Sequence, residues 1–176
     1  MTTASKITMI RVFMIPLYMI SMYLSGGQPG LWMWISLGIF IVASLTDFVD
    51  GYIARHYNQT TNFGKFMDPL ADKCLVTAAM VWFVEIGQMP GWALLVVLIR
   101  EFGVSGLRMI ASNQGRVIAA GWSGKVKTAA TMVCICLILF GIPPVLNTIC
   151  QWVILLTTVY SGVEYFYQNL DVFRDK

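Results

Sequence analysis

Six apolar segments of similar length dominate the chain, and this length most limits the folds open to it. Each is close to the roughly 20 residues that a helix needs to cross a bilayer. The segments lie at 8–25, 31–50, 68–86, 91–111, 122–142 and 145–168. Glycine and proline separate three neighbouring pairs of segments, at 26–30, 87–91 and 141–144. The sequence therefore predicts an all-α, polytopic membrane protein, in which residues 1–176 form a single domain of six transmembrane helices in one bundle.

Composition and charge agree with a membrane protein. Hydrophobic residues make up 57% of the 176 positions and charged residues only 12%, whereas soluble domains average about 25% charged residues. The net charge of +3 suits either an anionic membrane surface or an anionic substrate. Because the chain has no basic tail with interleaved aromatic residues, we expect no nucleic-acid partner.

The basic residues predict the orientation in the membrane. With six spans, both termini share one side with the connections after the second and fourth spans. All 12 Lys and Arg residues fall on that side or at the span ends next to it, and the turns at 24–31, 87–91 and 141–147 carry none. The positive-inside rule then places both termini in the cytoplasm. Arg100 falls in the middle of an apolar segment, so we expect it to face the protein interior rather than lipid.

Four aspartates gather around the connection between the second and third segments: Asp47, Asp50, Asp68 and Asp72. Spacings of three and four residues place each pair on one face of a helix. Ionised carboxylates beside hydrocarbon are costly unless something compensates their charge. Divalent cations such as Mg²⁺ or Mn²⁺ prefer hard oxygen ligands of this kind. The aspartates therefore predict metal-assisted chemistry on a phosphate-rich substrate at a membrane surface.

Helix capping is the simpler explanation for these aspartates. Asp68 precedes Pro69, so Asp68 is a plausible N-cap and Pro69 fits the first turn of a helix, where its missing N–H is harmless. Capping accounts for one aspartate of the four, and we therefore favour the metal site.

Small residues and an arginine accompany the aspartates. Gly51 and Ala54 share a helix face with the first two aspartates, and Gly64 lies on the connection. Their missing side chains would let a flat ring or a phosphate approach the backbone closely. Arg55 could hold a diphosphate through its planar guanidinium. Close helix packing by small residues and an arginine at the membrane interface are the alternatives.

A second basic group lies in the fourth and fifth segments: Arg100, Arg108, Lys125 and Lys127. Clustered cations fit an anionic group on a second substrate. The positive-inside rule alone is the alternative explanation for any one of them.

The aspartates and small residues form the pattern D-x2-D-G-x2-A-R-x8-G-x3-D-x3-D. This pattern resembles the signature of the CDP-alcohol phosphatidyltransferases and matches it at all eight positions. Other parts of the chain are similar to the bacterial phosphatidylglycerophosphate synthases of that family. These parts are Arg11 and the segments 63–73, 99–108 and 124–128.

The resemblance implies a reaction, an assembly and a location. CDP-diacylglycerol would react with sn-glycerol 3-phosphate to give phosphatidylglycerol phosphate and CMP. The protein would be a six-helix bundle, usually a homodimer, in the bacterial cytoplasmic membrane. Its polar cavity would face the cytoplasm and open sideways to membrane lipid.

The resemblance also implies residue roles. One or two divalent ions, Mg²⁺ or Mn²⁺, would bind Asp47, Asp50, Asp68 and Asp72. The CDP-diacylglycerol site would contain Asp50, Gly51, Ala54, Arg55 and Gly64. Asp72 would double as the catalytic base. The acceptor phosphate would bind the basic group Arg100, Arg108, Lys125 and Lys127.

Other readings stay open at this point. Within the family, the acceptor could be inositol phosphate, serine or phosphatidylglycerol. The basic group argues for a small phosphorylated acceptor and against serine, but it does not separate glycerol phosphate from inositol phosphate. Outside the family, the chain could be a cation transporter. A transporter predicts carboxylates near the membrane midplane, whereas these lie at the segment ends.

Overall fold

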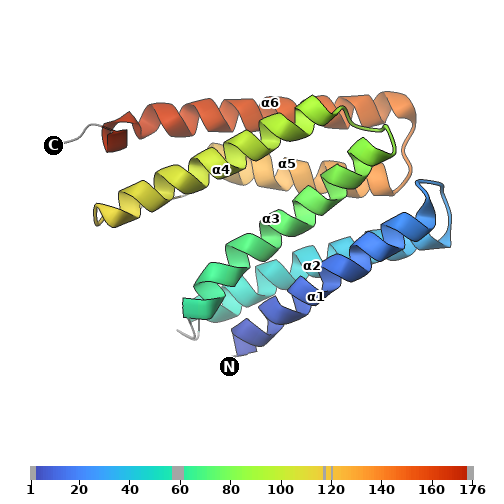
Figure 1. The fold of residues 1–176 in the computed structure, drawn as a ribbon, viewed down its shortest axis with the longest axis horizontal. Coiled ribbons are helices and arrows are strands. Elements are labelled where there is room, and N and C mark those ends of the chain that lie inside the picture. The colour runs from blue at the N-terminus through green and yellow to red at the C-terminus, as the bar shows by residue number, and fades with distance from the viewer. Residues whose placement is uncertain (1–2, 57–61, 117, 120, 174–176) are drawn as a thin grey trace. The chain divides into compact units, whose positions relative to one another are not determined.

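A computed structural model of the chain describes the backbone of residues 3–56, 62–116, 118–119 and 121–173, and the side chains of residues 9–46, 70–116, 118–119 and 121–172. This part of the chain is all-helical and contains no strand (Figure 1). The α-helices are α1 (Thr3–Ser25), α2 (Leu31–His56), α3 (Asn62–Glu85), α4 (Gly91–Asn113), α5 (Trp122–Leu139) and α6 (Pro144–Gln168), and a short 3-10 helix, η1 (Leu170–Phe173), follows them. The predicted all-α class and the predicted order of six helices are confirmed.

Glycines set the turns after α1, α3 and α5. The φ angles of Gly26, Gly87 and Gly141 are 56°, 73° and 84°. Only glycine adopts this left-handed conformation without strain, and it is the usual way to end a helix. These turns end the helices within three residues of the positions that the sequence predicted.

Three helices extend well beyond their apolar segments, and the first of them, α1, begins at Thr3. α2 continues to His56 and α3 begins at Asn62. Asp68 and Pro69 therefore lie inside α3, so the predicted start of this helix near Asp68 was wrong, and the alternative that Asp68 is its N-cap fails as well. The predicted start followed hydropathy, and residues 62–67 are polar enough to resemble a connection. They nevertheless contain no proline that would stop a helix.

The chain divides into two compact units, which are described separately. The first unit is formed by residues 1–87 and 136–142, and it contains α1, α2 and α3. The second is formed by residues 88–135 and 143–176, with α4, most of α5, α6 and η1. The single domain expected from the sequence remains a prediction.

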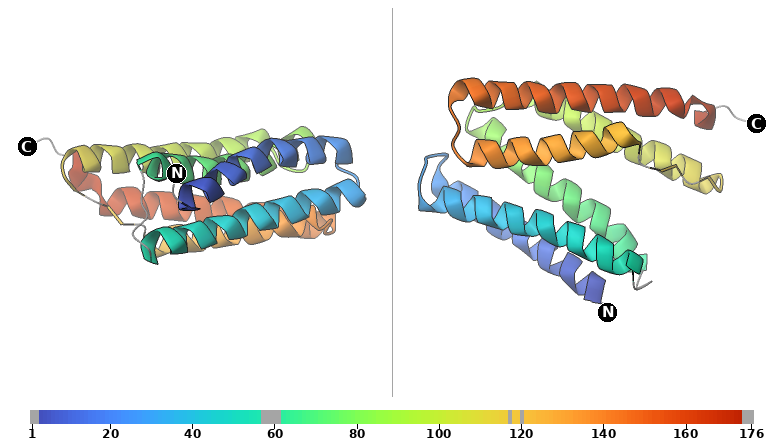
Figure 2. Two further views of the ribbon diagram at one scale, coloured as in Figure 1. Left: turned by 90° about the horizontal axis from the view of Figure 1, so that it is seen from below. Right: turned by 180° about the vertical axis from the view of Figure 1, so that it is seen from behind.

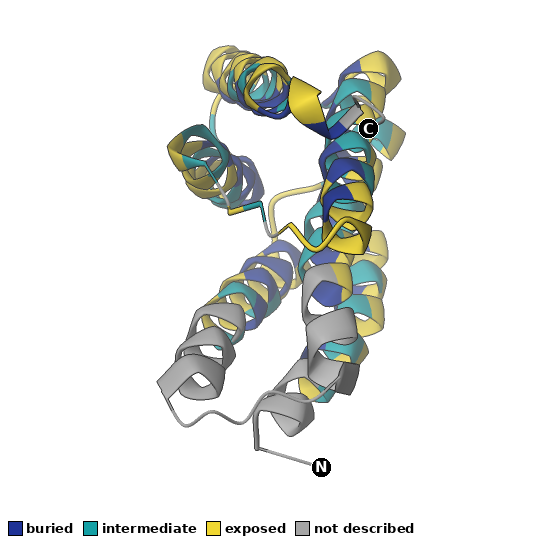
Figure 3. Cartoon of the chain, turned by 90° about the vertical axis from the view of Figure 1, so that its left-hand side faces the viewer, coloured by how far each residue is buried: buried dark blue, intermediate teal, exposed yellow. Residues whose placement is uncertain are grey.

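In the first unit, α1 packs against both α2 and α3 (Figure 2). The rings of Tyr18 and Phe40 lie 5.9 Å apart, and the hydroxyls of Ser21 and Ser36 are hydrogen-bonded at 2.7 Å. As residue numbers rise along α1 they fall along α2, so the two contacts fix an antiparallel register. The buried residues of a helix lie largely along one side of it (Figure 3).

In the second unit, α4 and α6 pack side by side and run parallel. Gly103 lies against Phe166, and beyond the C-terminal ends of the two helices the side-chain amide of Gln114 donates to the carbonyl oxygen of Val172 in η1. Buried apolar side chains join α4, α6 and η1: Val104, Leu107, Ala111, Tyr165 and Val172. η1 therefore packs against both α4 and α6.

Two helices of the described chain, α5 and α6, are long and apolar enough by composition to cross a membrane. Shorter apolar stretches occur in α1 at Met9–Ser25 and in α2 at Leu31–Thr46. Exposed apolar side chains recur along α6, namely Val145, Ile149, Trp152, Leu156 and Val163. A run of this kind along a helix is typical of a surface that contacts lipid or another protein.

Candidate active site

The four aspartates lie on two consecutive helices of the first unit. Asp47 and Asp50 belong to α2, and Asp68 and Asp72 belong to α3. Of these four side chains, the structure describes only that of Asp72, which is half-buried. The side chains of Asp47, Asp50, Asp68, Gly51, Ala54, Arg55 and Gly64 are outside the described residues, so their roles stay predictions.

Helical periodicity relates the α2 aspartates to a buried stripe. Phe40 and Ala43 are fully buried. Asp47 follows Ala43 by four residues and Asp50 follows it by seven, so the backbone places all of them on one face of α2. By the backbone alone, positions 47 and 50 of α2 therefore share a helix face with Phe40 and Ala43.

The same relation holds on α3. Leu75 and Ala79 are buried and follow Asp72 by three and seven residues. Asp68 precedes Asp72 by four residues. α2 and α3 also contact each other, so the two helices that carry the aspartate pairs are neighbours. Four hard oxygen donors on adjoining helices fit a divalent ion of the Mg²⁺ class.

Arg11 adds a buried positive charge to this unit. Its side chain is fully buried on α1, on the same face as Tyr18 seven residues later. Tyr18 contacts Phe40, and Asp47 lies seven residues after Phe40. In the antiparallel register, Arg11 is therefore level with the Asp47 turn of α2. A buried guanidinium at this height can offset part of the repulsion among the carboxylates.

The predicted basic group lies in the second unit, where the structure brings two of its members together. Nη1 of Arg100 lies 2.9 Å from Oε1 of Glu101, and Nζ of Lys127 lies 2.7 Å from the same oxygen. The side chains of Arg100 and Lys127 are only 12% and 6% exposed. The expectation that Arg100 faces the protein interior is confirmed.

The other two members of the basic group are placed differently. Nε of Arg108 donates to the hydroxyl of Tyr165 at 2.9 Å, and its guanidinium lies 5.5 Å from the centre of that ring. The side chain of Lys125 is exposed. The binding of one phosphate by all four cations remains a prediction.

Sequence reasoning missed two polar partners, Glu101 and Tyr165. A carboxylate beside an arginine within an apolar segment is a usable signal for Glu101, because a buried charge requires a partner. The contact that suggests a role for Tyr165 comes from Arg108, 57 positions earlier, and no local pattern could have shown it.

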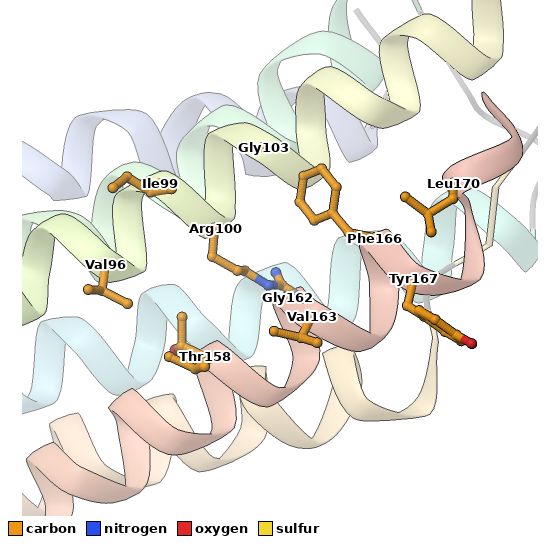
Figure 4. A pocket seen from close by; sticks show the side chains of 11 residues that line it. Val96, Ile99, Arg100, Gly103, Thr158, Gly162, Val163, Phe166, Tyr167 and Leu170 are labelled. Atoms are coloured by element: carbon orange, nitrogen blue, oxygen red, sulfur yellow. The ribbon is translucent and has the colours of Figure 1, made fainter. Parts of the chain in front are cut away.

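Arg100 also lines an open groove of about 550 Å³ between α4 and α6 (Figure 4). The other lining residues are mainly apolar, among them Val96, Ile99, Val163 and Phe166. The stem of Arg100 crosses this groove toward Gly162 of α6.

Comparison with known proteins identifies the family. The model that describes the CDP-alcohol phosphatidyltransferases matches residues 1–160. Three similar proteins bear the name CDP-diacylglycerol–glycerol-3-phosphate 3-phosphatidyltransferase. The Bacillus subtilis protein is 40% identical, covering 97% of this chain and 96% of its own. The Haemophilus influenzae protein is 36% identical, with 90% and 88% covered, and the Rickettsia felis protein is 31% identical, with 91% of each. The resemblance found in the sequence motif is thereby confirmed, and the chain belongs to the CDP-alcohol phosphatidyltransferase family.

Proposed function

We propose that the chain is a phosphatidylglycerophosphate synthase, a transferase of phospholipid biosynthesis. It transfers the phosphatidyl group of CDP-diacylglycerol to sn-glycerol 3-phosphate and releases CMP. The observation that carries this proposal is the likeness to whole proteins named for that reaction, with up to 97% of this chain covered. The complete eight-position signature of the family supports it.

The aspartates supply the chemistry of this proposal. Asp47, Asp50, Asp68 and Asp72 would hold one or two divalent ions, and such ions would supply neutralising charge for the diphosphate and for the CMP that leaves. Asp72 accepts the proton of the acceptor hydroxyl as that oxygen bonds to the phosphorus bearing diacylglycerol. The bond from this phosphorus to the bridging oxygen breaks, and CMP leaves with that oxygen. Gly51, Ala54, Arg55 and Gly64 complete the CDP-diacylglycerol site with Asp50.

A membrane-embedded bundle with six spans follows from the same proposal. α4 carries Arg100, Glu101 and Arg108 within its length, which lowers its hydropathy. Glu101 is paired with Arg100 and Lys127, and Arg108 with Tyr165. Charges that are satisfied inside the protein cost a transmembrane helix far less than charges that face lipid.

The distribution of basic residues gives the orientation. The turns 26–30, 86–90 and 140–143 between the observed helices contain no Lys or Arg. We place these turns outside and both termini in the cytoplasm of the bacterial inner membrane. The aspartates then face the cytoplasm, where glycerol 3-phosphate arrives from water. CDP-diacylglycerol never leaves the bilayer, so the site must open sideways to lipid. As a separate part of the proposal, the active form would be a homodimer.

The acceptor can be tested directly with purified protein. We expect transfer from CDP-diacylglycerol to be at least about tenfold faster with glycerol 3-phosphate than with inositol phosphate or serine at equal concentration, a preference of about 1.4 kcal/mol. The measurement is CMP release with each acceptor. A preference for inositol phosphate would keep the family and reject this member of it.

The acceptor site can be tested with Arg108 and Lys125. A charge-assisted hydrogen bond to phosphate contributes about 1.5–3 kcal/mol. We therefore expect Arg108→Ala or Lys125→Ala to raise KM for glycerol 3-phosphate about tenfold or more. KM for CDP-diacylglycerol should change little, because the predicted metal site and Arg55 hold that substrate.

Arg116 provides the control for this test. It is an exposed cation of the same unit that pairs with Asp171, and Arg116→Ala should leave both KM values near those of the wild type. Variants of Arg108 and Lys125 that weaken only CDP-diacylglycerol would show that these cations are not the acceptor site.

A further inference from the structure

Glu101 lies between two cations that are proposed to bind the acceptor, and it is itself a poor ligand for an anion. One oxygen, Oε1, accepts from both Nη1 of Arg100 and Nζ of Lys127, at 2.9 and 2.7 Å. Arg100 comes from α4 and Lys127 from α5, so this carboxylate ties two helices together. Its side chain is only 18% exposed, and ionic contacts of this kind are weakly screened by salt.

Without Glu101, the side chains of Arg100 and Lys127 would repel each other and move apart. Two like charges close together at low exposure repel each other strongly. Both side chains are long, and each has several rotatable bonds through which it could move toward water. A shared carboxylate removes the repulsion and fixes both ammonium and guanidinium groups in one place.

The path of Arg100 is fixed by two glycines. A methyl group added at Gly162 of α6 would lie 3.1 Å from Cγ of Arg100, and one added at Gly124 of α5 would lie 3.4 Å from Nη2. The side chain thus passes Gly162 with its stem and ends beside Gly124 (Figure 4). An alanine at Gly162 would require this stem to shift by a few tenths of an ångström.

We propose that Glu101 is a positioning residue that holds Arg100 and Lys127 together as one binding site for the acceptor phosphate, with Gly162 leaving room for Arg100. This inference rests on the proposed function. The group of three carries one net positive charge, and its two cations are ordered before the phosphate arrives. A preordered site avoids part of the entropy cost of fixing two long side chains on binding.

Glu101→Gln separates positioning from simple neutralisation. If Glu101 only reduced the positive charge, its loss would tighten the binding of a phosphate and lower KM for glycerol 3-phosphate. Positioning predicts the opposite, a KM raised about tenfold, with KM for CDP-diacylglycerol within about twofold of the wild type. Glu101→Asp keeps the charge and should recover part of the affinity. A lowered or unchanged acceptor KM in a folded Glu101→Gln enzyme would overturn the proposal.

A double-mutant cycle tests whether Glu101 acts through Lys127. Residues that act as a unit show strongly non-additive effects. Lys127→Met should raise the acceptor KM by itself, and adding Glu101→Gln should then change it much less than in the wild type. Full additivity would overturn the positioning role. If Arg100→Ala and Lys127→Met leave the acceptor KM unchanged while the wild type uses glycerol 3-phosphate, the acceptor site itself is wrong.

Three glycine variants test the same idea without touching a charge. Gly162→Ala crowds Arg100 and should raise the acceptor KM severalfold. Gly103→Ala, one turn along α4 from Arg100, instead meets the Phe166 ring, at 3.0 Å, and strains the same pair of helices without contacting Arg100. Gly106→Ala meets nothing within 4 Å and should resemble the wild type. Equal rises in the acceptor KM for Gly162→Ala and Gly103→Ala would indicate a packing effect and overturn the role of Gly162.

Discussion

Asp72→Asn is expected to reduce kcat by about 10²–10⁴-fold, the range typical for loss of a general base. Asparagine has nearly the same shape as aspartate, but it cannot accept the proton of the acceptor hydroxyl and is a weaker metal ligand. Asp72 is half-buried, and on the same helix face Leu75 and Ala79 are buried. The substitution should therefore preserve helix packing. The measurement is the initial rate at saturating concentrations of both substrates.

KM for CDP-diacylglycerol should distinguish the role of Asp72 as a metal ligand from its role as the general base. Three other aspartates remain to hold metal, so KM for CDP-diacylglycerol should rise less than kcat falls. Asp171 supplies a matched control, because it is an exposed carboxylate of η1 that pairs with Arg116. Asp171→Asn should keep nearly full kcat. A folded Asp72→Asn enzyme with near-normal kcat would remove Asp72 from the mechanism.

The order of the helices was predictable because the lengths of the apolar segments and the positions of the turn glycines indicate the same helix ends. Gly26, Gly87 and Gly141 each follow a long apolar run, and each adopts the left-handed conformation that ends a helix. The prediction failed only where the two signals differ. Residues 62–67 belong to α3 by backbone structure, although their polarity resembles a connection.

The contents of the site were predictable where spacing carries the information. The four aspartates recur at helical intervals, and the structure adds that their positions lie on two helices in contact, α2 and α3. Contacts between distant positions carry no such signal. Arg108 meets Tyr165 and Lys127 meets Glu101 only through the packing of α4 with its neighbours, and these partners determine which cations are free to move.

The basic group of the second unit and the four aspartates of the first unit differ in how their charge is compensated. In the second unit, Glu101 offsets Arg100 and Lys127 within the protein. In the first unit, α2 and α3 carry four aspartates, and among the described residues Arg11 of α1 is a buried cation. Carboxylates held close together require either protonation or bound cations. The proposed metal site is therefore also what would keep these carboxylates ionised and able to act.

Removal of divalent cations with EDTA should abolish turnover, and Mg²⁺ or Mn²⁺ should restore it. Four aspartates that repel one another and a substrate with a diphosphate both need the positive charge of the metal. Binding should also be visible without turnover. Metal at about 100 times its Kd stabilises the folded state by about 2.7 kcal/mol, so the thermal unfolding midpoint should rise when metal is added to the EDTA-treated enzyme.

The double variant Asp47→Asn, Asp50→Asn separates this site from general effects of ions on the membrane or the substrate. Both residues lie on one face of α2, and losing two of four carboxylates should remove the metal-dependent rise in unfolding temperature together with activity. The Asp171→Asn control should show the full rise. Full activity in metal-free buffer would reject the metal-dependent mechanism. A rise of equal size in the double variant would show that the stabilising ion binds elsewhere, because asparagine side chains cannot replace two ionised ligands of a hard divalent cation.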